Sequence, residues 1–424
     1  MKGLLTLAAR SAWNRRFVLS LVALSIALST LLLLSIERIR IDVRESFSQS
    51  VSGTDLIVGA RTGSMQLLLY SVFRIGSATN NIRWRSVQDV AAHKAVAWTV
   101  PISLGDSHRG FAVLATTRGY FEHFRYADKQ ALSLAQGKAF EGVFDVVLGA
   151  EVARKLGCSL GSKVVLSHGD GAMAANDHAD KPFTVVGILR ATGTPVDRSL
   201  HIGLDGMQAI HLDWAAGVPL PGTSSSTSVP ADQINQHDLT PKNVTALLVG
   251  LKNRAAVFSV QRAVADYADE PLMAILPGVA LDELWAVVGV GESALLLMSG
   301  LVALISLAGL VAVIMAGLNE RRRELAILRA VGAGPKTVLL LLALEGALVT
   351  LCGVLLGLLL YLVLVWGLGD WTAQSFGVAL KLQTPSANEG LLVGGVMLAG
   401  WLASLVPGWR AYRLSLADGL SPRI

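Results

Sequence analysis

The chain contains 424 residues, of which 52% are hydrophobic and only 16% are charged, and its mean hydropathy is +0.53. This composition excludes an ordinary soluble domain. The net charge of +5 is small, and most of it lies in segments that flank apolar runs, so it indicates membrane topology and not nucleic-acid binding.

Four apolar runs are long enough to cross a bilayer, which takes about 20 predominantly apolar residues. They are predicted at residues 17–36, 291–318, 337–368 and 389–409. The first run follows a basic amphipathic leader (residues 1–16). It is longer than a signal-peptide core and has no small-residue cleavage site after it, so we expect an uncleaved anchor.

Glu345 lies inside the third apolar run. An uncompensated carboxylate is costly at this depth of a bilayer. We therefore expect Glu345 to face another helix or the edge of the membrane.

Basic residues gather in the leader, in residues 319–336 and in the tail (residues 410–424). With four spans these three segments share one side of the membrane, and the positive-inside rule assigns them to the cytoplasm. Residues 37–290 and the short loop 369–388 then face outward. Cys158 and Cys352 fall in different compartments, so we expect neither a disulfide between them nor a cysteine-based metal cluster.

The outward segment, residues 37–290, is large enough for one large domain or two small ones. Short runs such as DLIVGA, WTVPISLG, FAVLATT, FDVVLGA, KPFTVVGILR and NVTALLVGL predict strands. GAEVARKLG predicts a helix that ends at Gly157, KNRAAVFSVQRAVADYA predicts another, and TGTPVDRSLHIGLDGMQAIH predicts a turn, a strand and a short helix. The segment is therefore expected to be an α+β domain.

All eight histidines lie in the outward segment. One polar loop combines imidazole and carboxylate groups, which are zinc-type ligands: His168, Asp170, Asp177, His178 and Asp180. The loop contains no pair of ligands spaced by one helical turn, and polar residues also gather in solvated loops. The sequence leaves both a weak or transient metal site and a plain solvated loop open, and we assign no metal ligand.

The sequence carries no motif for catalysis. GAGPKT (residues 332–337) lacks the spacing of a phosphate-binding loop, and neither a G-x-S-x-G elbow nor an H-E-x-x-H motif is present. We expect a non-catalytic membrane subunit, with no catalytic residue and no directly bound cofactor. A membrane enzyme remains an alternative.

The segment between the second and third apolar runs, NERRRELAILRAVGAGPKT, is far more charged than a simple hairpin loop needs to be. Leu325, Leu328 and Val331 recur at helical spacing and form an apolar stripe, and Gly332 and Pro335 predict where the helix stops. The arginines also suit a helix that rests on anionic lipid. However, the glutamates would be repelled by such a surface, and a stripe bordered by both signs of charge better suits a groove on a protein.

Residues 320–333, ERRRELAILRAVGA, ahead of a long apolar run, resemble the FtsX/MacB-type permeases of ABC transporters. The resemblance covers most of the chain. It includes the N-terminal anchor and four further motifs: SGTDLIVGAR (52–61), VLGAEVARKLG (147–157), FTVVGIL (183–189) and PGWRAYRLSLADGLSP (407–422).

The resemblance implies four transmembrane α-helices and a MacB-like periplasmic core domain (residues 37–290), with an inserted variable subdomain, between the first and second spans. It implies a stand-alone permease without a fused ATPase domain, in the bacterial inner membrane, with both termini cytoplasmic. Such permeases form homodimers and bind two copies of a separate ABC ATPase, and it is this ATPase that binds ATP and Mg²⁺. Movement of the ATPases is transmitted along the spans to the outward domains, a mechanism called mechanotransmission.

By the same resemblance, residues 319–336 contain the coupling helix that the ATPase grips. The residues expected to make this contact are Glu320, Arg323, Glu324, Leu325, Leu328, Arg329 and Gly332. Lipoproteins, lipids, peptides, macrolide-like compounds and metal-related cargo are all compatible with the sequence as the transported cargo. A periplasmic or outer-membrane partner is also compatible with it. A different class of function is an FtsX-like regulator that signals to a periplasmic hydrolase without transporting a solute.

Overall fold

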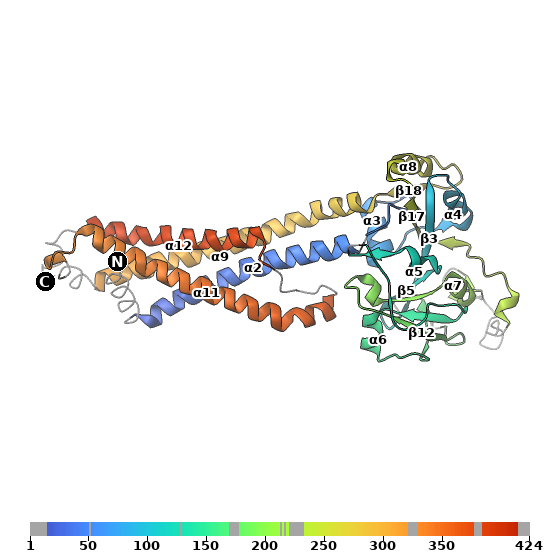
Figure 1. Ribbon diagram of the computed structural model, residues 1–424, viewed down its shortest axis with the longest axis horizontal. Helices are drawn as coiled ribbons and strands as arrows, with labels where there is room; N and C mark the ends of the chain where they lie inside the picture. Colours follow the sequence, from blue (N-terminus) through green and yellow to red (C-terminus); the bar gives the residue numbers. More distant parts are fainter. Residues whose placement is uncertain are drawn as a thin grey trace. The chain divides into compact units, whose positions relative to one another are not determined.

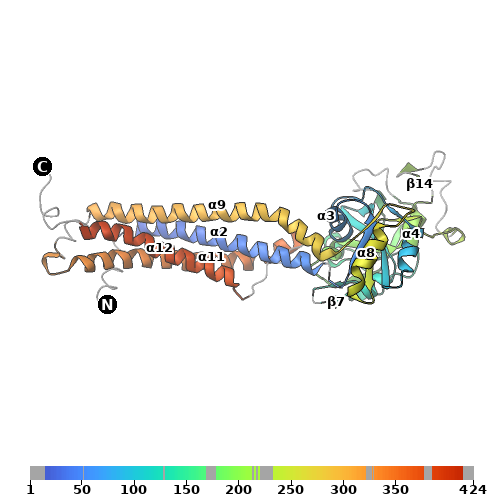
Figure 2. The same cartoon turned by 90° about the horizontal axis from the view of Figure 1, so that it is seen from above.

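The computed structural model describes residues 15–50, 52–127, 129–168, 178–212, 214–215, 218–219, 233–320, 327, 329–376 and 384–413. These residues divide into a helical unit and an α/β unit, whose elements are labelled in Figures 1 and 2. Helices α2 (Arg16–Gln49) and α9 (Pro277–Glu320) contribute to both units: residues 43–287 belong to the α/β unit, and the flanking parts belong to the helical unit.

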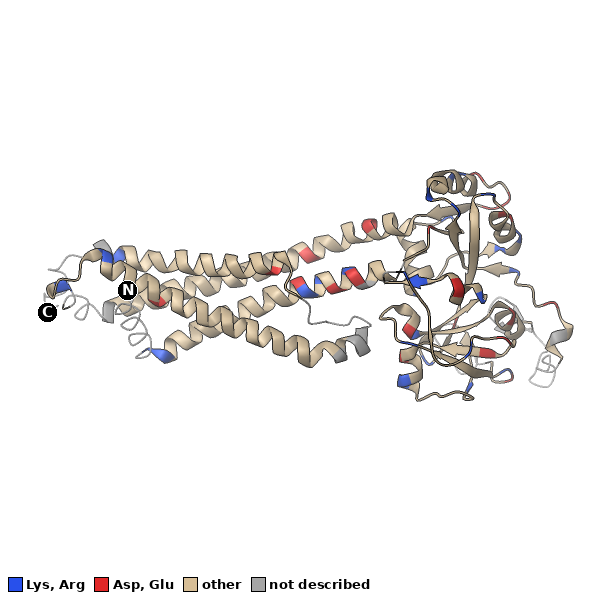
Figure 3. Ribbon diagram, viewed as in Figure 1, with Lys and Arg blue, Asp and Glu red and all other residues tan. Residues whose placement is uncertain are grey.

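The helical unit consists of four helices that are long and apolar enough to cross a membrane: α2, α9, α11 (Pro335–Phe376) and α12 (Ala387–Arg413). Figure 3 shows that charged residues are sparse along most of α9, α11 and α12. The prediction of four membrane helices, with a large α/β domain between the first and the second, is confirmed.

Helix α2 continues well beyond the apolar run of residues 17–36. The continuation carries ion pairs at helical spacing, Arg38 with Asp42 at 3.0 Å and Arg40 with Glu37 at 3.1 Å. Such pairs stabilise a helix beyond the point where its sequence stops being predominantly apolar. Hydropathy therefore predicts only the apolar part of α2, because the remaining part is stabilised by ion pairs, which hydropathy does not measure.

Glycines allow α11 to pack closely against α2. A Cβ added at Gly353 would lie 2.8 Å from the Cβ of Ile26, and one added at Gly357 would lie 2.7 Å from the carbonyl oxygen of Ala27. The two glycines are four residues apart, which is the small-xxx-small spacing that lets membrane helices approach one another. The α2–α11 contact therefore depends on the absence of a side chain at these two positions.

Polar groups inside the helical unit are turned toward other helices. Ser306 of α9 lies 2.9 Å from Ser25 and 2.8 Å from Ser29 of α2, oxygen to oxygen, so hydroxyl groups join the two helices. Glu345 of α11 is only 1% exposed. Of the two expectations for Glu345, another helix or the edge of the membrane, this burial favours the first.

Helix α12 begins with a capping box. The Ser386 backbone N–H donates to the Glu389 carboxylate at 2.7 Å, and the Glu389 backbone N–H donates to the Ser386 hydroxyl at 3.1 Å. Each residue satisfies a donor that the first turn of the helix leaves unpaired. This cap fixes where the last membrane helix starts.

The α/β unit is built on one large, mixed sheet, twelve-stranded within the described residues. Its main path runs β10 (Lys163–Val164), β12 (Phe183–Leu189), β9 (Asp145–Leu148), β13 (Ser199–Gly203), β5 (Phe111–Thr116), β3 (Val96–Ser103), β17 (Ala246–Leu251), β1 (Leu56–Ala60) and β18 (Leu272–Ile275). Three strands lie off this path: β4 (Asp106–His108) pairs with β5 and β11 (Ser167–His168), and β8 (Leu134–Gly137) pairs with β12. Three two-stranded ladders are separate from it: β2 (Ile82–Arg83) with β16 (Asn243–Val244), β6 (Arg125–Tyr126) with β7 (Gln130–Ala131), and β14 (Trp214–Ala215) with β15 (Val218–Pro219).

Both faces of the sheet are covered, because successive side chains of a strand point to opposite faces. Leu56 and Val58 of β1 belong to one buried cluster, and Ile57 between them belongs to another. The remaining helical segments of the unit are α3 (Ser64–Leu68), η1 (Leu69–Phe73), α4 (Trp84–Ala91), α5 (Gly119–His123), α6 (Ala150–Leu156), η3 (Pro195–Arg198), α7 (Leu204–Ile210), η4 (Ile234–Gln236), η5 (Arg254–Ala256) and α8 (Val257–Ala265).

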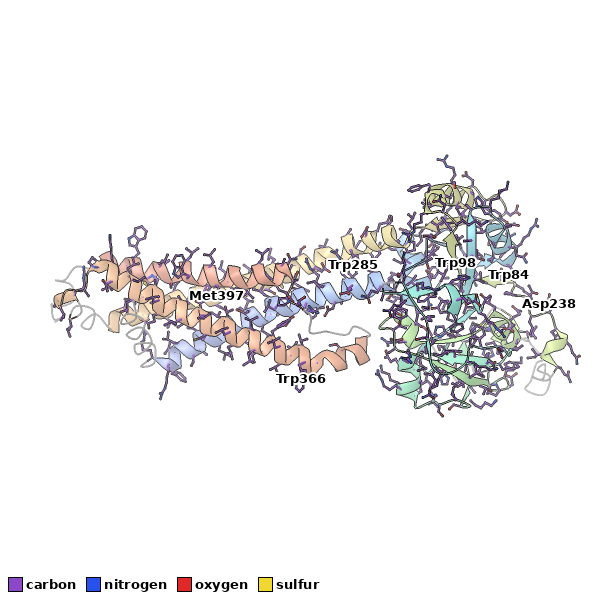
Figure 4. The ribbon with its side chains drawn as sticks, viewed as in Figure 1. Trp84, Trp98, Asp238, Trp285, Trp366 and Met397 are labelled. Carbon is purple, nitrogen blue, oxygen red and sulfur yellow. The ribbon has the colours of Figure 1, made fainter. Side chains whose placement is uncertain are left out.

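Aromatic residues fix two positions in the α/β unit, which Figure 4 labels. Trp285 of α9 lies edge-on to Phe47 of α2 at 5.5 Å between ring centroids. Trp98 of β3 stacks on His123 at 4.8 Å, and a Cβ added at Gly250 would lie 2.1 Å from its indole ring. A glycine is therefore needed at position 250 to leave room for Trp98.

Candidate functional site

The bridge between α9 and α11 is described only in part. Helix α9 ends at Glu320, whose side chain is not described. The described part of the bridge begins with Ile327 and continues from Arg329. Four of the residues expected to contact an ATPase lie outside the described residues: Arg323, Glu324, Leu325 and Leu328.

The described part of the bridge ends a helix and exposes apolar side chains. The Val331 backbone N–H donates to the Ile327 carbonyl at 3.0 Å, which closes one helical turn. Gly332 follows in the left-handed region at φ 101°, and α11 starts at Pro335. Ile327 is 62% exposed and Val331 is 83% exposed. The predicted helix stop at Gly332 is confirmed, and two apolar residues beside it are uncovered.

The end of α9 and the start of α2 lie at the same end of the helical unit as the bridge (Figures 1 and 2). The Arg15 guanidinium donates to the Val313 carbonyl of α9 at 3.3 Å. Arg16, Lys336 and Arg410 belong to the first turns of α2 and α11 and to the last turn of α12, and Figure 3 shows basic segments at that end of the helical unit. The basic residues of the leader, the bridge and the tail that the structure describes therefore lie toward one end of the membrane helices.

A second candidate site lies in the α/β unit, where four potential metal ligands meet: Asp106, His168, His178 and His211. Each comes from a different place in the chain. Antiparallel pairing of β4 with β11 sets His168 directly opposite Asp106. His178 is held by its backbone N–H, which donates to the Leu166 carbonyl at 2.8 Å, and His211 follows the last residue of α7.

The ligand atoms of this His–Asp cluster all lie within 4.8 Å of one another. His168 Nδ1 is 2.9 Å from Asp106 Oδ1. His211 Nε2 is 3.3 Å from His168 Nδ1 and 3.6 Å from Asp106 Oδ2. The Asp106 side chain is fully buried, whereas the side chains of His168 and His211 are 33% and 24% exposed. The cluster thus has a buried carboxylate on one side and two partly exposed imidazoles on the other.

The hydrogen bonds determine which ring nitrogens carry protons. The Met207 carbonyl can only accept, so His211 Nδ1–H donates to it at 2.9 Å. In the neutral imidazole, Nε2 of His211 is then unprotonated, and its lone pair faces the cluster. His168 Nδ1–H donates to the Asp106 carboxylate, and the same nitrogen lies 3.3 Å from His211 Nε2.

The electrostatics of the cluster follow from burial and from these contacts. Burial alone would raise the pKa of Asp106, but the imidazoles of His168 and His211 outweigh it and lower the pKa to about 2. The hydrogen bond to Asp106 raises the pKa of His168. Burial lowers the pKa of His178 to about 4. At neutral pH the cluster therefore contains an ionised carboxylate and a neutral His178.

The sequence indicated only part of this cluster. His168 and His178 belong to the loop that was considered for weak metal binding, and Asp170 and Asp177 of that loop lie outside the described residues. Asp180 pairs instead with Lys181, at 3.6 Å. Asp106 and His211 were not anticipated, because the pairing of β4 with β11 and the end of α7 bring them in from distant parts of the chain.

Comparison with known families decides what kind of protein this is. The model of the MacB-like periplasmic core domain matches residues 18–267, more than half of the chain. The model of the FtsX-like permease C-terminal domain matches residues 296–416. The chain belongs to the FtsX/MacB-like family of ABC transporter permeases. Its resemblance to that family, seen first in the bridge, is thereby confirmed, and the protein is a membrane permease subunit.

The curated relatives of this FtsX/MacB-like permease include transmembrane proteins of lipoprotein-releasing systems, named LolC. The protein from Xylella fastidiosa (strain 9a5c) is 24% identical over 300 residues, which cover 66% of this chain and 65% of the relative. The protein from Neisseria meningitidis serogroup B is 26% identical over 234 residues, which cover 54% of this chain and 49% of the relative. The matched region thus spans less than two thirds of the length of these relatives.

Two solved structures also align with the permease. The periplasmic region of MacB from Actinobacillus actinomycetemcomitans aligns with 56% of this chain and 97% of its own length, at 10% identity and a TM-score of 0.33. The extracellular domain of the transporter YknZ from Gram-positive bacteria aligns with 52% of this chain and 99% of its own length, at 12% identity and a TM-score of 0.29. The family assignment rests on the sequence models and not on these alignments.

Proposed function

We propose that this permease couples ATP hydrolysis by a separate ABC ATPase to movements of its periplasmic domain, and so exports or extracts a cargo. The observation that carries the proposal is the bridge between α9 and α11. It has exposed apolar side chains at Ile327 and Val331, and it lies in a chain whose family works with ATPases. In this proposal residues 320–332 are the coupling helix that sits in a groove of the ATPase.

The charges of the bridge support a surface position on the cytoplasmic side. An arginine at the centre of a membrane helix costs roughly 2.5–3.5 kcal/mol, so Arg321, Arg322 and Arg323 would hold the ends of α9 and α11 at the cytoplasmic surface. A short helix fused to both spans would move them together when the ATPases close on ATP. Leu325 and Leu328 would be the buried apolar contacts, while Glu320, Arg323, Glu324 and Arg329 would set the orientation.

The proposed assembly is a homodimer with two ATPase subunits, in the inner membrane, with both termini in the cytoplasm. Only 28% of the most apolar stretch of α9 and 22% of that of α12 is buried within the chain. Large apolar side chains of α9, such as Leu297, Leu304 and Ile305, are more than half exposed. These helix faces are available to lipid and to a second copy of the chain.

The relatives named as lipoprotein-releasing proteins suggest a cargo class for this proposal. A lipid-anchored protein in the outer leaflet is a cargo that a moving periplasmic domain can extract without a channel through the membrane. The alternative function is an FtsX-like regulator that uses the same movement to signal to a periplasmic hydrolase.

Stimulation of ATP hydrolysis distinguishes these two functions. The permease is purified with the ABC ATPase with which it assembles, reconstituted in vesicles, and tested with an acylated lipoprotein, the same protein without its acyl chains, and a peptidoglycan hydrolase. We expect the acylated protein to raise the hydrolysis rate several-fold and the unacylated protein to leave it unchanged. Stimulation by the hydrolase alone would favour the regulator and contradict transport.

A further inference from the structure

We propose that the α/β unit holds a divalent transition-metal ion of the zinc class, bound by Asp106, His168, His178 and His211. The proposal is independent of how the ATPase docks, because all four ligands belong to the α/β unit. The argument rests on the types of donor atom, on their separations, and on the hydrogen bond that orients one of them.

The donor set is the one that zinc uses. Zinc is bound in proteins by imidazole nitrogen, carboxylate oxygen and thiolate sulfur, and structural sites have four ligands in tetrahedral geometry. Three imidazoles and one carboxylate meet that requirement without a fifth group. Calcium and magnesium prefer oxygen ligands throughout, so a set with three nitrogens disfavours both.

The separations fit a single ion. Zinc bonds of about 2.0–2.2 Å place the ligand atoms of a tetrahedral site roughly 3.3 Å apart. His168 Nδ1 is 2.9 Å from Asp106 Oδ1 and 3.3 Å from His211 Nε2, and His211 Nε2 is 3.6 Å from Asp106 Oδ2. One ligand atom from each of the four residues lies within 4.8 Å of the others. Because the upper bound of 4.8 Å exceeds the tetrahedral spacing, some of the ligand side chains would move closer together when the ion binds.

Two of the ligands are already arranged for a cation. The His211 Nδ1–H bond to the Met207 carbonyl, at 2.9 Å, orients the ring and leaves Nε2 directed at the cluster. Ligating histidines usually donate their other N–H in this way. Asp106 Oδ2 is buried and accepts no hydrogen bond from the described residues. A buried carboxylate oxygen without a donor is costly, and a bound cation would satisfy it.

Metal binding would replace the hydrogen bond between His168 and Asp106 by bonds from both residues to the ion. His168 Nδ1 lies 2.9 Å from Asp106 Oδ1 and 3.3 Å from His211 Nε2. A zinc ion at this position would coordinate Nδ1 of the other neutral tautomer of His168, in which the proton is on Nε2. The partial exposure of His168 and His211 gives the ion a way in from that side.

The site can be tested on the full-length permease in detergent, purified without a polyhistidine tag, stripped with EDTA and dialysed. Zinc chloride is titrated by calorimetry, and bound zinc is counted by elemental analysis. We expect one zinc ion per chain, a higher melting temperature in the presence of zinc, and the visible absorption of four-coordinate cobalt when cobalt(II) replaces it.

The variants His168→Ala and His211→Ala each remove one ligand at a partly exposed position, and Asp106→Asn keeps the shape of the buried side chain. Each is expected to weaken zinc binding at least about 100-fold, because loss even of a group that only orients a ligand costs 10–100-fold. The matched control is His237→Ala, which removes an exposed histidine outside the cluster.

Melting temperatures measured without metal show whether each variant is folded. The site is supported if folded variants lose both zinc and the cobalt spectrum while His237→Ala keeps them. The proposal is overturned if wild-type protein binds no zinc. It is also overturned if the ligand variants bind as much zinc as His237→Ala.

Discussion

Replacing Leu325 or Leu328 by glutamate is expected to abolish association of the permease with its ATPase while leaving its insertion into the membrane intact. Burying a leucine contributes about 1.5–3 kcal/mol, and a carboxylate placed in an apolar groove adds a desolvation penalty of several kcal/mol. The loss of affinity should therefore be at least about 100-fold. Co-purification of the tagged permease with the ATPase, followed by immunoblotting, measures it.

The control for these variants is Ala330→Glu. Ala330 is exposed and comes two residues after Leu328, so on a helix with 3.6 residues per turn it lies away from the stripe of Leu325 and Leu328. The Ala330→Glu variant introduces the same negative charge into the same bridge as the leucine variants do. Ala330→Glu should retain the ATPase. Normal co-purification of the Leu325 and Leu328 variants would refute the assignment of the coupling helix.

The double variant Gly353→Leu, Gly357→Leu is expected to disrupt the helical unit. A Cβ at either position would lie under 3 Å from atoms of α2, and two leucine side chains cannot be accommodated without separating the helices. Overpacking costs about 1–3 kcal/mol per site, so the pair should destabilise the unit by about 2–6 kcal/mol. Thermal melting of purified protein in detergent, together with gel filtration, measures the effect.

Gly367→Leu is the matched control for this pair. Gly367 belongs to the same helix, α11, but a Cβ added there meets no atom within 4 Å. That variant should melt close to wild type and elute as a single peak. If the double variant also melts like wild type, α11 does not pack against α2 through these glycines.

Properties that depend on residues near one another in the sequence could be predicted. The four spans follow from the length of the apolar runs, and the described helices agree with them. Gly157 ends α6 in the left-handed region at φ 64°, as the predicted helix stop requires. The turn, strand and short helix expected after residue 190 appear as η3, β13 and α7.

Features that depend on distant pairing could not be predicted. Asp106 and His168 become neighbours only because β4 pairs with β11, and two-residue strands such as β11 leave almost no periodic signal. His211 joins them because α7 ends beside them, and no spacing rule links residues this far apart. The continuation of α2 past residue 36 was missed for a different reason: Arg38 and Asp42 stabilise a helix through an ion pair, which hydropathy does not detect.

The measurement that tests the central claim most directly is photo-crosslinking from position 328 in native membranes. A photoreactive amino acid replaces Leu328 in a permease co-expressed with its ATPase, and the crosslinked product is identified by mass spectrometry. The account predicts a crosslink to the ATPase that disappears in the Leu325→Glu background. Crosslinks to lipid alone, with the ATPase bound elsewhere on the permease, would contradict it.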